Sequence, residues 1–170
     1  MRRVLVVMLG LLAAGCGSQL SGPAPSPAAA DASEVDMCTI LTDPELSQLG
    51  IKLSTRKQVN ELGVVGCQWV GKPITLDLER EKDTIAQYQA RQHSPTFTSF
   101  VDNTVNGRAG AHLSVRSDRT DCTQLMDGGP VSLTVAVAPA FSLNGPSVDS
   151  CAEALRIAQM IEPRLPKAGS

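Results

Sequence analysis

The sequence predicts an α+β domain: a single, mainly antiparallel β-sheet of about five or six strands, with a short N-terminal helix and a C-terminal helix packed on it, stapled by two disulfides. Three observations lead to this fold class. Short runs with the two-residue alternation of strands are separated by turn residues. Capping boxes predict a helix near each end of the domain. Four of the five cysteines lie within the domain.

Residues 1–15 are typical of a lipoprotein signal peptide. Arg2 and Arg3 precede an apolar run that ends in Leu11-Leu12-Ala13-Ala14-Gly15-Cys16, with small residues before a cysteine as in a lipobox. The apolar run, residues 4–14, has 11 residues. A spanning helix needs about 20, so a retained transmembrane anchor is a weaker alternative, and a secreted protein without lipid is another. We predict lipidation of Cys16.

Residues 16–33 are predicted to be a flexible tether rich in Ser, Pro and Ala, and residues 34–170 a single domain. Removing residues 1–15 takes away two of the 15 basic side chains and none of the 17 acidic ones, so the net charge falls from −2 to −4. A mildly acidic domain is a poor binder of nucleic acid. We therefore expect no nucleic-acid partner, and contact with the membrane through the lipid on Cys16.

The cysteines of the domain are Cys38, Cys67, Cys122 and Cys151, and an even number in an exported domain implies two disulfides. Four cysteines allow three pairings, which the sequence alone does not distinguish. We favour Cys38–Cys67 and Cys122–Cys151, each of which closes a loop of 29 residues. In the chain-entropy model such a loop contributes roughly 3–4 kcal/mol. A zinc site is the alternative, but the cysteine spacings do not match structural zinc patterns, and we expect no metal.

Three helices are predicted, over residues 43–49, 84–92 and 151–162. Their expected N-caps are Thr42, Asp83 and Ser150, and the first and last are followed three residues later by a glutamate. Gly50 and Pro163 are expected to end the first and the last helix. The second helix should bury Ile85 and Tyr88, and the apolar positions of the last one fall on one face at helical spacing.

Six strands are predicted, over residues 63–70, 74–79, 97–105, 110–116, 122–126 and 131–138. In the first of them Cys67 and Trp69 share one face. Asp127-Gly128-Gly129 predicts the turn of a hairpin between the last two. Strands joined by hairpins imply a mainly antiparallel sheet, and a helix must cover one face to bury its apolar side chains.

Several motifs together resemble those of a known family. After the lipobox and the tether come Cys38 followed by Ile40-Leu41, then Gly66-Cys67-Gln68-Trp69, Cys122 and Cys151-Ala152-Glu153-Ala154. Over residues 36–166 the chain resembles a family of actinobacterial cell-envelope lipoproteins that is defined only as a domain of unknown function and includes the mycobacterial lipoproteins LprB and LprC. The resemblance implies an envelope protein with an α+β domain. It brings no catalytic residues to this sequence.

The titratable residues do not match a known catalytic pattern. His93 lies at a predicted helix end and His112 within a predicted strand, so both are interpreted as surface or structural residues. Carboxylates alternate along residues 77–83 with Arg80 and Lys82 between them, which favours a solvated face of the sheet. We expect no catalytic residues, no enzyme activity and no cofactor.

Three residues are candidates for contact with a ligand or partner. Trp69 is one, although its place beside Cys67 favours packing on a disulfide in the core. Phe141 and Leu143 are the others, because they lie in a loop over residues 138–148 that is long enough to form a rim or lid.

These observations predict an exported lipoprotein on the outer face of the cell membrane that acts as a non-catalytic binding module for an apolar envelope molecule or a glycan. A cleft lined by apolar side chains would support this function. The alternative is an accessory or regulatory subunit that docks on an envelope protein, such as a membrane complex or a sensor kinase. An exposed apolar patch would favour that alternative.

Overall fold

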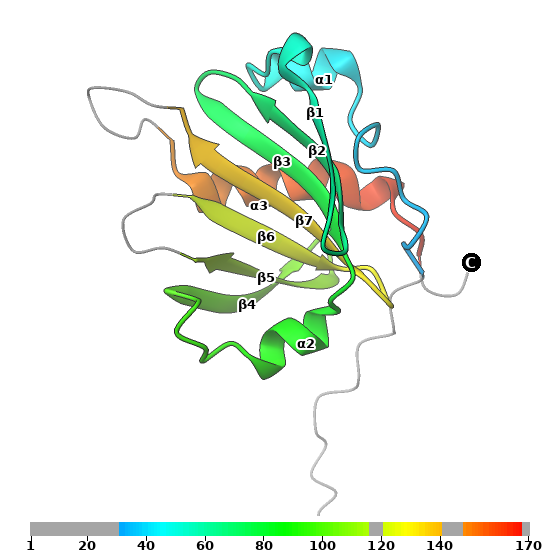
Figure 1. The fold of residues 1–170 in the computed structure, drawn as a ribbon, viewed down its shortest axis with the longest axis vertical. Helices are drawn as coiled ribbons and strands as arrows, with labels where there is room; N and C mark the ends of the chain where they lie inside the picture. The colour runs from blue at the N-terminus through cyan, green and yellow to red at the C-terminus, as the bar shows by residue number, and fades with distance from the viewer. Residues whose placement is uncertain (1–30, 116–120, 141–147, 168–170) are drawn as a thin grey trace, which may run out of the picture.

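The computed structural model describes residues 31–115, 121–140 and 148–167. These residues form one antiparallel sheet of seven strands in the order β1-β2-β3-β7-β6-β5-β4, with a long helix across it (Figure 1). The strands are β1 (Lys57–Glu61), β2 (Val64–Val70), β3 (Ile74–Glu81), β4 (Ser99–Val105), β5 (Arg108–Ser114), β6 (Cys122–Asp127) and β7 (Ser132–Pro139). The helices are α1 (Asp43–Gln48), η1 (Leu53–Thr55), α2 (Ile85–Ala90), α3 (Ser150–Ile161) and η2 (Glu162–Arg164).

The described sheet has seven strands instead of five or six because β1 was not predicted. Its sequence, Lys57-Gln58-Val59-Asn60-Glu61, holds one apolar residue, and none of its residues is fully buried. A strand at the edge of a sheet with little buried area has no need for the apolar alternation by which strands are recognised. The other six strands are the predicted ones, and their ends differ from the prediction by no more than two residues.

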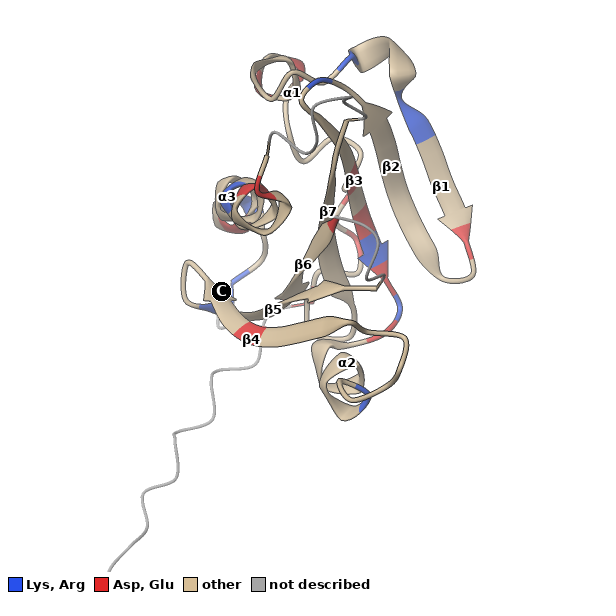
Figure 2. Ribbon diagram, turned by 90° about the vertical axis from the view of Figure 1, so that its left-hand side faces the viewer, with Lys and Arg blue, Asp and Glu red and all other residues tan. Residues whose placement is uncertain are grey.

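One face of the sheet, the α3 face, is covered by α3 (Figure 2). The helix buries Ala154, Ile157, Ala158 and Ile161 against a core built from alternate residues of the strands. The strand residues of this core are Cys67, Trp69, Ile74, Leu76, Leu78, Val105, Met126, Leu133, Val135 and Val137. The predicted alternation of β3 is confirmed, since Ile74, Leu76 and Leu78 all lie in this core, next to Val135 and Val137 of β7.

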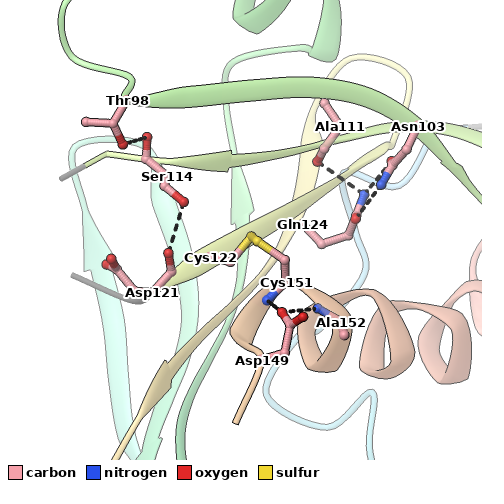
Figure 3. Close-up of a disulfide and its surroundings, with 10 residues drawn as sticks. All are labelled: Thr98, Asn103, Ala111, Ser114, Asp121, Cys122, Gln124, Asp149, Cys151 and Ala152. Atoms are coloured by element: carbon pink, nitrogen blue, oxygen red, sulfur yellow. Dashed lines mark hydrogen bonds between the residues drawn. A yellow bond between two sulfur atoms is a disulfide. The ribbon is translucent and has the colours of Figure 1, made fainter. Parts of the chain in front are cut away.

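The N-cap of α3 is Asp149, one residue before the expected Ser150. The Asp149 carboxylate accepts hydrogen bonds from the amides of Cys151 and Ala152, both at 3.1 Å (Figure 3). Aspartate and serine are similarly good N-caps, so the sequence pattern does not distinguish two such residues in a row.

The N-terminal helix does not pack across the sheet as α3 does. α1 is six residues long, lies beyond the ends of the strands and contacts mainly η1 (Figure 1). Thr42 and Glu45 form its capping box, and Leu46 reaches into the core. The packed domain also begins earlier than residue 34, because Ala32 is fully buried and its amide donates a hydrogen bond to the carbonyl of Gly128 at 3.0 Å.

Two disulfides fasten the outer segments to the sheet, and their pairing is the one favoured from the sequence. Cys38–Cys67 ties the N-terminal segment to β2, and Cys122–Cys151 ties the first turn of α3 to β6 (Figure 3). No helix within the described residues has the length and apolar character needed to cross a membrane.

An arginine whose side chain is largely buried fixes the C-terminal segment. The Arg108 guanidinium on β5 pairs with the Glu162 carboxylate at 3.3 Å, and both side chains are largely removed from solvent. The same guanidinium donates to the carbonyls of Asp127 at 2.8 Å and Pro166 at 2.7 Å. Arg108 therefore joins β5, the turn after β6 and the chain beyond η2 at one point.

Candidate functional site

A cleft of about 330 Å³ lies on the side of the sheet opposite α3, which we call the α2 face. It is enclosed by α2, the loop that follows α2, and strands β5 and β6. The lining residues are Glu81, Tyr88, Arg91, Ser94, Thr96, Phe97, Leu113, Val115, Thr123 and Leu125. The cleft thus combines an apolar floor with a polar rim, the usual composition of a small-molecule site.

Helix α2 positions the wall of the cleft. Its N-cap is Thr84, whose hydroxyl accepts from the Gln87 amide while the Gln87 side chain accepts from the Thr84 amide. The expected cap, Asp83, instead forms an ion pair with Arg91 at 2.6 Å. Ile85 and Tyr88 are buried as predicted, so the helix lies with its apolar side against the sheet.

Two aromatic rings, those of Tyr88 and Phe97, line one end of the cleft, and the Phe100 ring packs against Phe97 outside the lining. The ring centroids of Tyr88 and Phe97 are 6.3 Å apart, and those of Phe97 and Phe100 are 5.8 Å apart. They pack on Leu113 and Leu125, which belong to a second apolar cluster separate from the core under α3. The α2 face is therefore apolar over β5 and β6, and the helix covers only part of it.

The charged groups of the cleft have partners within the protein. The Tyr88 hydroxyl donates a hydrogen bond to the Glu81 carboxylate. Burial, together with this hydrogen bond, raises the pKa of Tyr88 above its usual value. The Arg91 guanidinium lies over the Tyr88 ring at 4.3 Å from its centroid, in addition to its pair with Asp83. Its hydrogen bond to Asp83 raises the pKa of Arg91. A ligand in the cleft therefore meets charges that are already compensated.

A row of carboxylates runs along β3 on the same face. Asp77, Glu79 and Glu81 alternate on this strand and are half-buried, so the expected solvated face is partly wrong. Burial, together with the nearby charges of Asp77 and Glu81, raises the pKa of Glu79 to about 7. Burial also raises the pKa of Asp77, whose Oδ1 atom is buried without a hydrogen-bond partner.

The row of carboxylates does not form a metal site. Among the described residues, no three His, Cys, Asp or Glu side chains are grouped so that they could hold a metal ion. His93 is exposed in the loop after α2, His112 is half-buried on β5, and neither lines the cleft.

The sequence candidates for ligand contact do not line the cleft. Trp69 is 1% exposed and lies in the core under α3, so its ring is not available to a ligand. The Arg56 guanidinium lies 5.8 Å from its ring centroid, and the Arg56 Nε atom is 3.5 Å from the Cys67 sulfur. Phe141, Leu143 and the predicted lipidation site Cys16 lie outside the described residues.

Sequence reasoning missed the cleft, although one signal was present. In β6 the side chains of Cys122 and Met126 face α3, while Leu125 faces the opposite side together with Leu113 of β5. A strand that is apolar on both faces must be covered on both. That pattern, next to a short helix with a buried tyrosine, points to a second apolar layer over β5 and β6.

No curated protein and no solved structure matches the chain. A family described as "Protein of unknown function (DUF3558)" matches residues 11–164, which is most of the 170 residues. The match begins before Cys16 and ends with η2, so it spans every described helix and strand. The chain therefore belongs to this family of proteins of unknown function.

Proposed function

We propose that this domain is a binding module that holds a small, neutral, amphipathic molecule in the cleft beside α2. The observation that carries the proposal is the cleft itself, about 330 Å³ with five apolar or aromatic residues and several hydroxyls in its lining. Its size is near the lower end of ligand pockets in proteins. It suits one sugar unit or a short acyl or aryl group, and is too small for a whole lipid with several chains.

The neutrality of the ligand follows from the contacts of the charged side chains. Glu81 is bonded by Tyr88, and Arg91 is held by Asp83 and the Tyr88 ring. A charged ligand would have to displace one of these partners, whereas a neutral one would not. Within the described residues the Thr123 hydroxyl makes no hydrogen bond, so it is free to bind a hydroxyl or carbonyl of the ligand.

We also propose that the chain is an exported actinobacterial lipoprotein like LprB and LprC, anchored to the outer face of the cell membrane through a lipid on Cys16. The supporting features are the basic and apolar residues before Cys16, the two disulfides and the family match that includes Cys16. A Cys16→Ala variant should lose incorporation of radiolabelled palmitate and leave the membrane fraction. Unchanged labelling of this variant would contradict the anchor.

The binding experiment uses the full chain and the fluorescence of N-phenyl-naphthylamine, a neutral apolar dye, with octyl glucoside below its micelle concentration as the competitor. We expect the dye to bind and octyl glucoside to displace it. Val115→Arg should abolish binding, because Val115 lines the cleft and is 42% exposed. The matched control is Val101→Arg on β4, where the valine is 49% exposed and not part of the cleft.

Equal loss of dye binding in both variants, or no binding in the wild-type chain, would overturn the proposal. Native mass spectrometry of the full chain, purified from its own envelope, is the complementary measurement. A mass in excess of the lipidated chain that disappears in the Val115→Arg variant would identify the class of the natural ligand.

A further inference from the structure

β1 is one of the two edge strands of the described sheet and pairs only with β2 among the described strands (Figure 2). The two strands are joined by the two-residue turn Leu62-Gly63, in which φ is 54° and 87°. In such a hairpin the residues that flank the turn form a hydrogen-bonded pair, and the pairs alternate from there. The peptide groups of Lys57, Val59 and Glu61 therefore face β2.

The peptide groups of Gln58 and Asn60 consequently face away from the sheet. A hydrogen bond beside the hairpin agrees with this alternation. Val70 lies an even number of residues from Val64 in β2, so its peptide group should face the β1 side. Its carbonyl does accept a hydrogen bond there, from the Lys52 amide at 3.1 Å. An edge with outward donors and acceptors is a template for another strand.

Most polar side chains of β1 also lack partners within the described residues. Within the described residues Lys57, Gln58, Asn60 and Glu61 make no side-chain hydrogen bond or ion pair, and all four are exposed. On the α3 face an open groove of about 620 Å³ runs beside Gln58 and Asn60, bounded by the N-terminal segment. A strand added at this edge would find space for the side chains that it turns toward that face.

The sequence of β1 is complementary to itself in the antiparallel direction. When two copies of Lys57-Gln58-Val59-Asn60-Glu61 are aligned about Val59, each Lys57 lies opposite Glu61 of the other copy. Gln58 lies opposite Asn60, so the two outward-facing peptide groups become a hydrogen-bonded pair on each side of the axis. Val59 then lies opposite Val59 of the other copy in a non-hydrogen-bonded pair, where side chains approach most closely.

We propose that two copies of this chain associate through β1, in this antiparallel register, to form one continuous sheet. In this register the charged side chains, the carboxamide side chains and the outward-facing peptide groups all gain partners. This complementarity favours a second copy of the chain as the occupant of the edge. The interface is independent of the proposed cleft, which lies at β5 and β6 on the far side of the sheet. A single strand pair buries less than the ~1,200–2,000 Å² of a stable complex, so the association is weak and concentration-dependent.

A disulfide trap reads the register directly. In the full chain in membranes, Val59→Cys should form an intermolecular disulfide on mild oxidation, because residue 59 faces its own copy across the axis. Gln58→Cys is the matched control, since residue 58 faces residue 60 and should not be trapped. Equal trapping of both variants, no trapping of Val59→Cys, or its capture on a different protein would overturn the proposal.

Charge reversal tests the same register without relying on one substitution. In the Val59→Cys protein, Lys57→Glu or Glu61→Lys places like charges opposite each other at two places in the dimer. Each substitution should lower the fraction trapped as a disulfide at least about threefold. The double variant Lys57→Glu/Glu61→Lys restores opposite charges and should recover the yield. Failure of the double variant to recover, with each single variant impaired, would contradict the register.

Asn60→Pro provides a third, structural test by sedimentation at high protein concentration. Its amide faces away from β2, so proline removes a donor of the proposed pair and none of the β1–β2 ladder. We expect a folded monomer where the wild-type chain dimerises. A dimer of unchanged strength would overturn the proposal.

Discussion

The carboxamides of Asn103 and Gln124 bond each other twice across the width of β5. Asn103 Nδ2 donates to Gln124 Oε1 at 2.8 Å, and Gln124 Nε2 donates back to Asn103 Oδ1 at 2.9 Å (Figure 3). Gln124 is fully buried, and its Nε2 also lies within 3.1 Å of the Ala111 carbonyl and 2.8 Å of the Leu125 carbonyl. Gly110, which pairs with Asn103 in the sheet, leaves the space that this contact needs.

The amide pair should behave as one energetic unit. Gln124→Leu removes the partner of Asn103 and of two carbonyls, so we expect a loss of about 1–3 kcal/mol in the free energy of unfolding. Asn103→Ala in the Gln124→Leu background should then cost much less than in the wild type. Urea unfolding of the four proteins of this double-mutant cycle measures the coupling, and additive losses would contradict the pair.

Arg108→Met should destabilise the domain by about 3–5 kcal/mol, because it leaves the largely buried Glu162 carboxylate without its cation. The matched control is Arg156→Met. Arg156 pairs with Glu153 on the exposed side of α3 and should contribute less than about 1 kcal/mol. Urea unfolding measures the free energy of unfolding of both variants. Similar losses in the two would show that Arg108 does not hold the C-terminal segment in place.

Glu79 should make stability fall as pH rises. Its folded pKa, about 7, lies above the ordinary value of 4.5, so the folded state holds this proton more tightly than the unfolded chain. The contribution of Glu79 is therefore complete below about pH 4.5 and is lost as pH rises through 7. Glu79→Gln should match the wild type at pH 4 and exceed it in unfolding midpoint at pH 8. A difference that does not change with pH would contradict the raised pKa.

Glu45 should give the opposite dependence. The Arg164 guanidinium, which bonds its carboxylate, and the Thr42 amide lower the pKa of Glu45 to about 2. The stabilising contribution of Glu45 is then present above about pH 4.5 and is lost as pH falls toward 2. NMR titration of the Glu45 side-chain carbon checks the midpoint, and Arg164→Gln should move it upward. An unmoved midpoint would assign the shift to the capping box alone.

Removing either disulfide should lower the free energy of unfolding by roughly 3–4 kcal/mol, since each closes a loop of 29 residues. The paired variants are Cys38→Ala/Cys67→Ala and Cys122→Ala/Cys151→Ala. The fluorescence of Trp69, the single tryptophan, reports unfolding in both. A loss near zero for one pair would show that the noncovalent contacts of that segment already fix it.

The sequence predicts this fold well where side chains are buried on one face. The alternation in β3 and β7 and the capping box of α1 follow from local chemistry and are recovered in the structure. The N-caps of α2 and α3 were misplaced by one residue because Asp83-Thr84 and Asp149-Ser150 each offer two good caps. Asp83 forms an ion pair with Arg91 in place of capping the helix, and no local sequence pattern reveals that contact.

The candidate site depends on contacts that the sequence does not express. Tyr88 was expected to be buried, but its meeting with Phe97 and Leu125 depends on how the chain crosses β5 and β6. Trp69 was considered for ligand contact because large aromatic side chains often bind ligands, yet the register of β2 turns it into the core. The raised pKa of Glu79 also requires knowledge of which carboxylates share a face and how deeply they lie.

Both ends of the domain attach to the turn between β6 and β7. The Ala32 amide bonds the Gly128 carbonyl, and Arg108 bridges the carbonyls of Asp127 and Pro166. Chain ends that emerge side by side can be joined by a short linker without straining the strands between them. The order of the elements can thus be circularly permuted, and the domain can be grafted whole into a surface loop of a carrier protein.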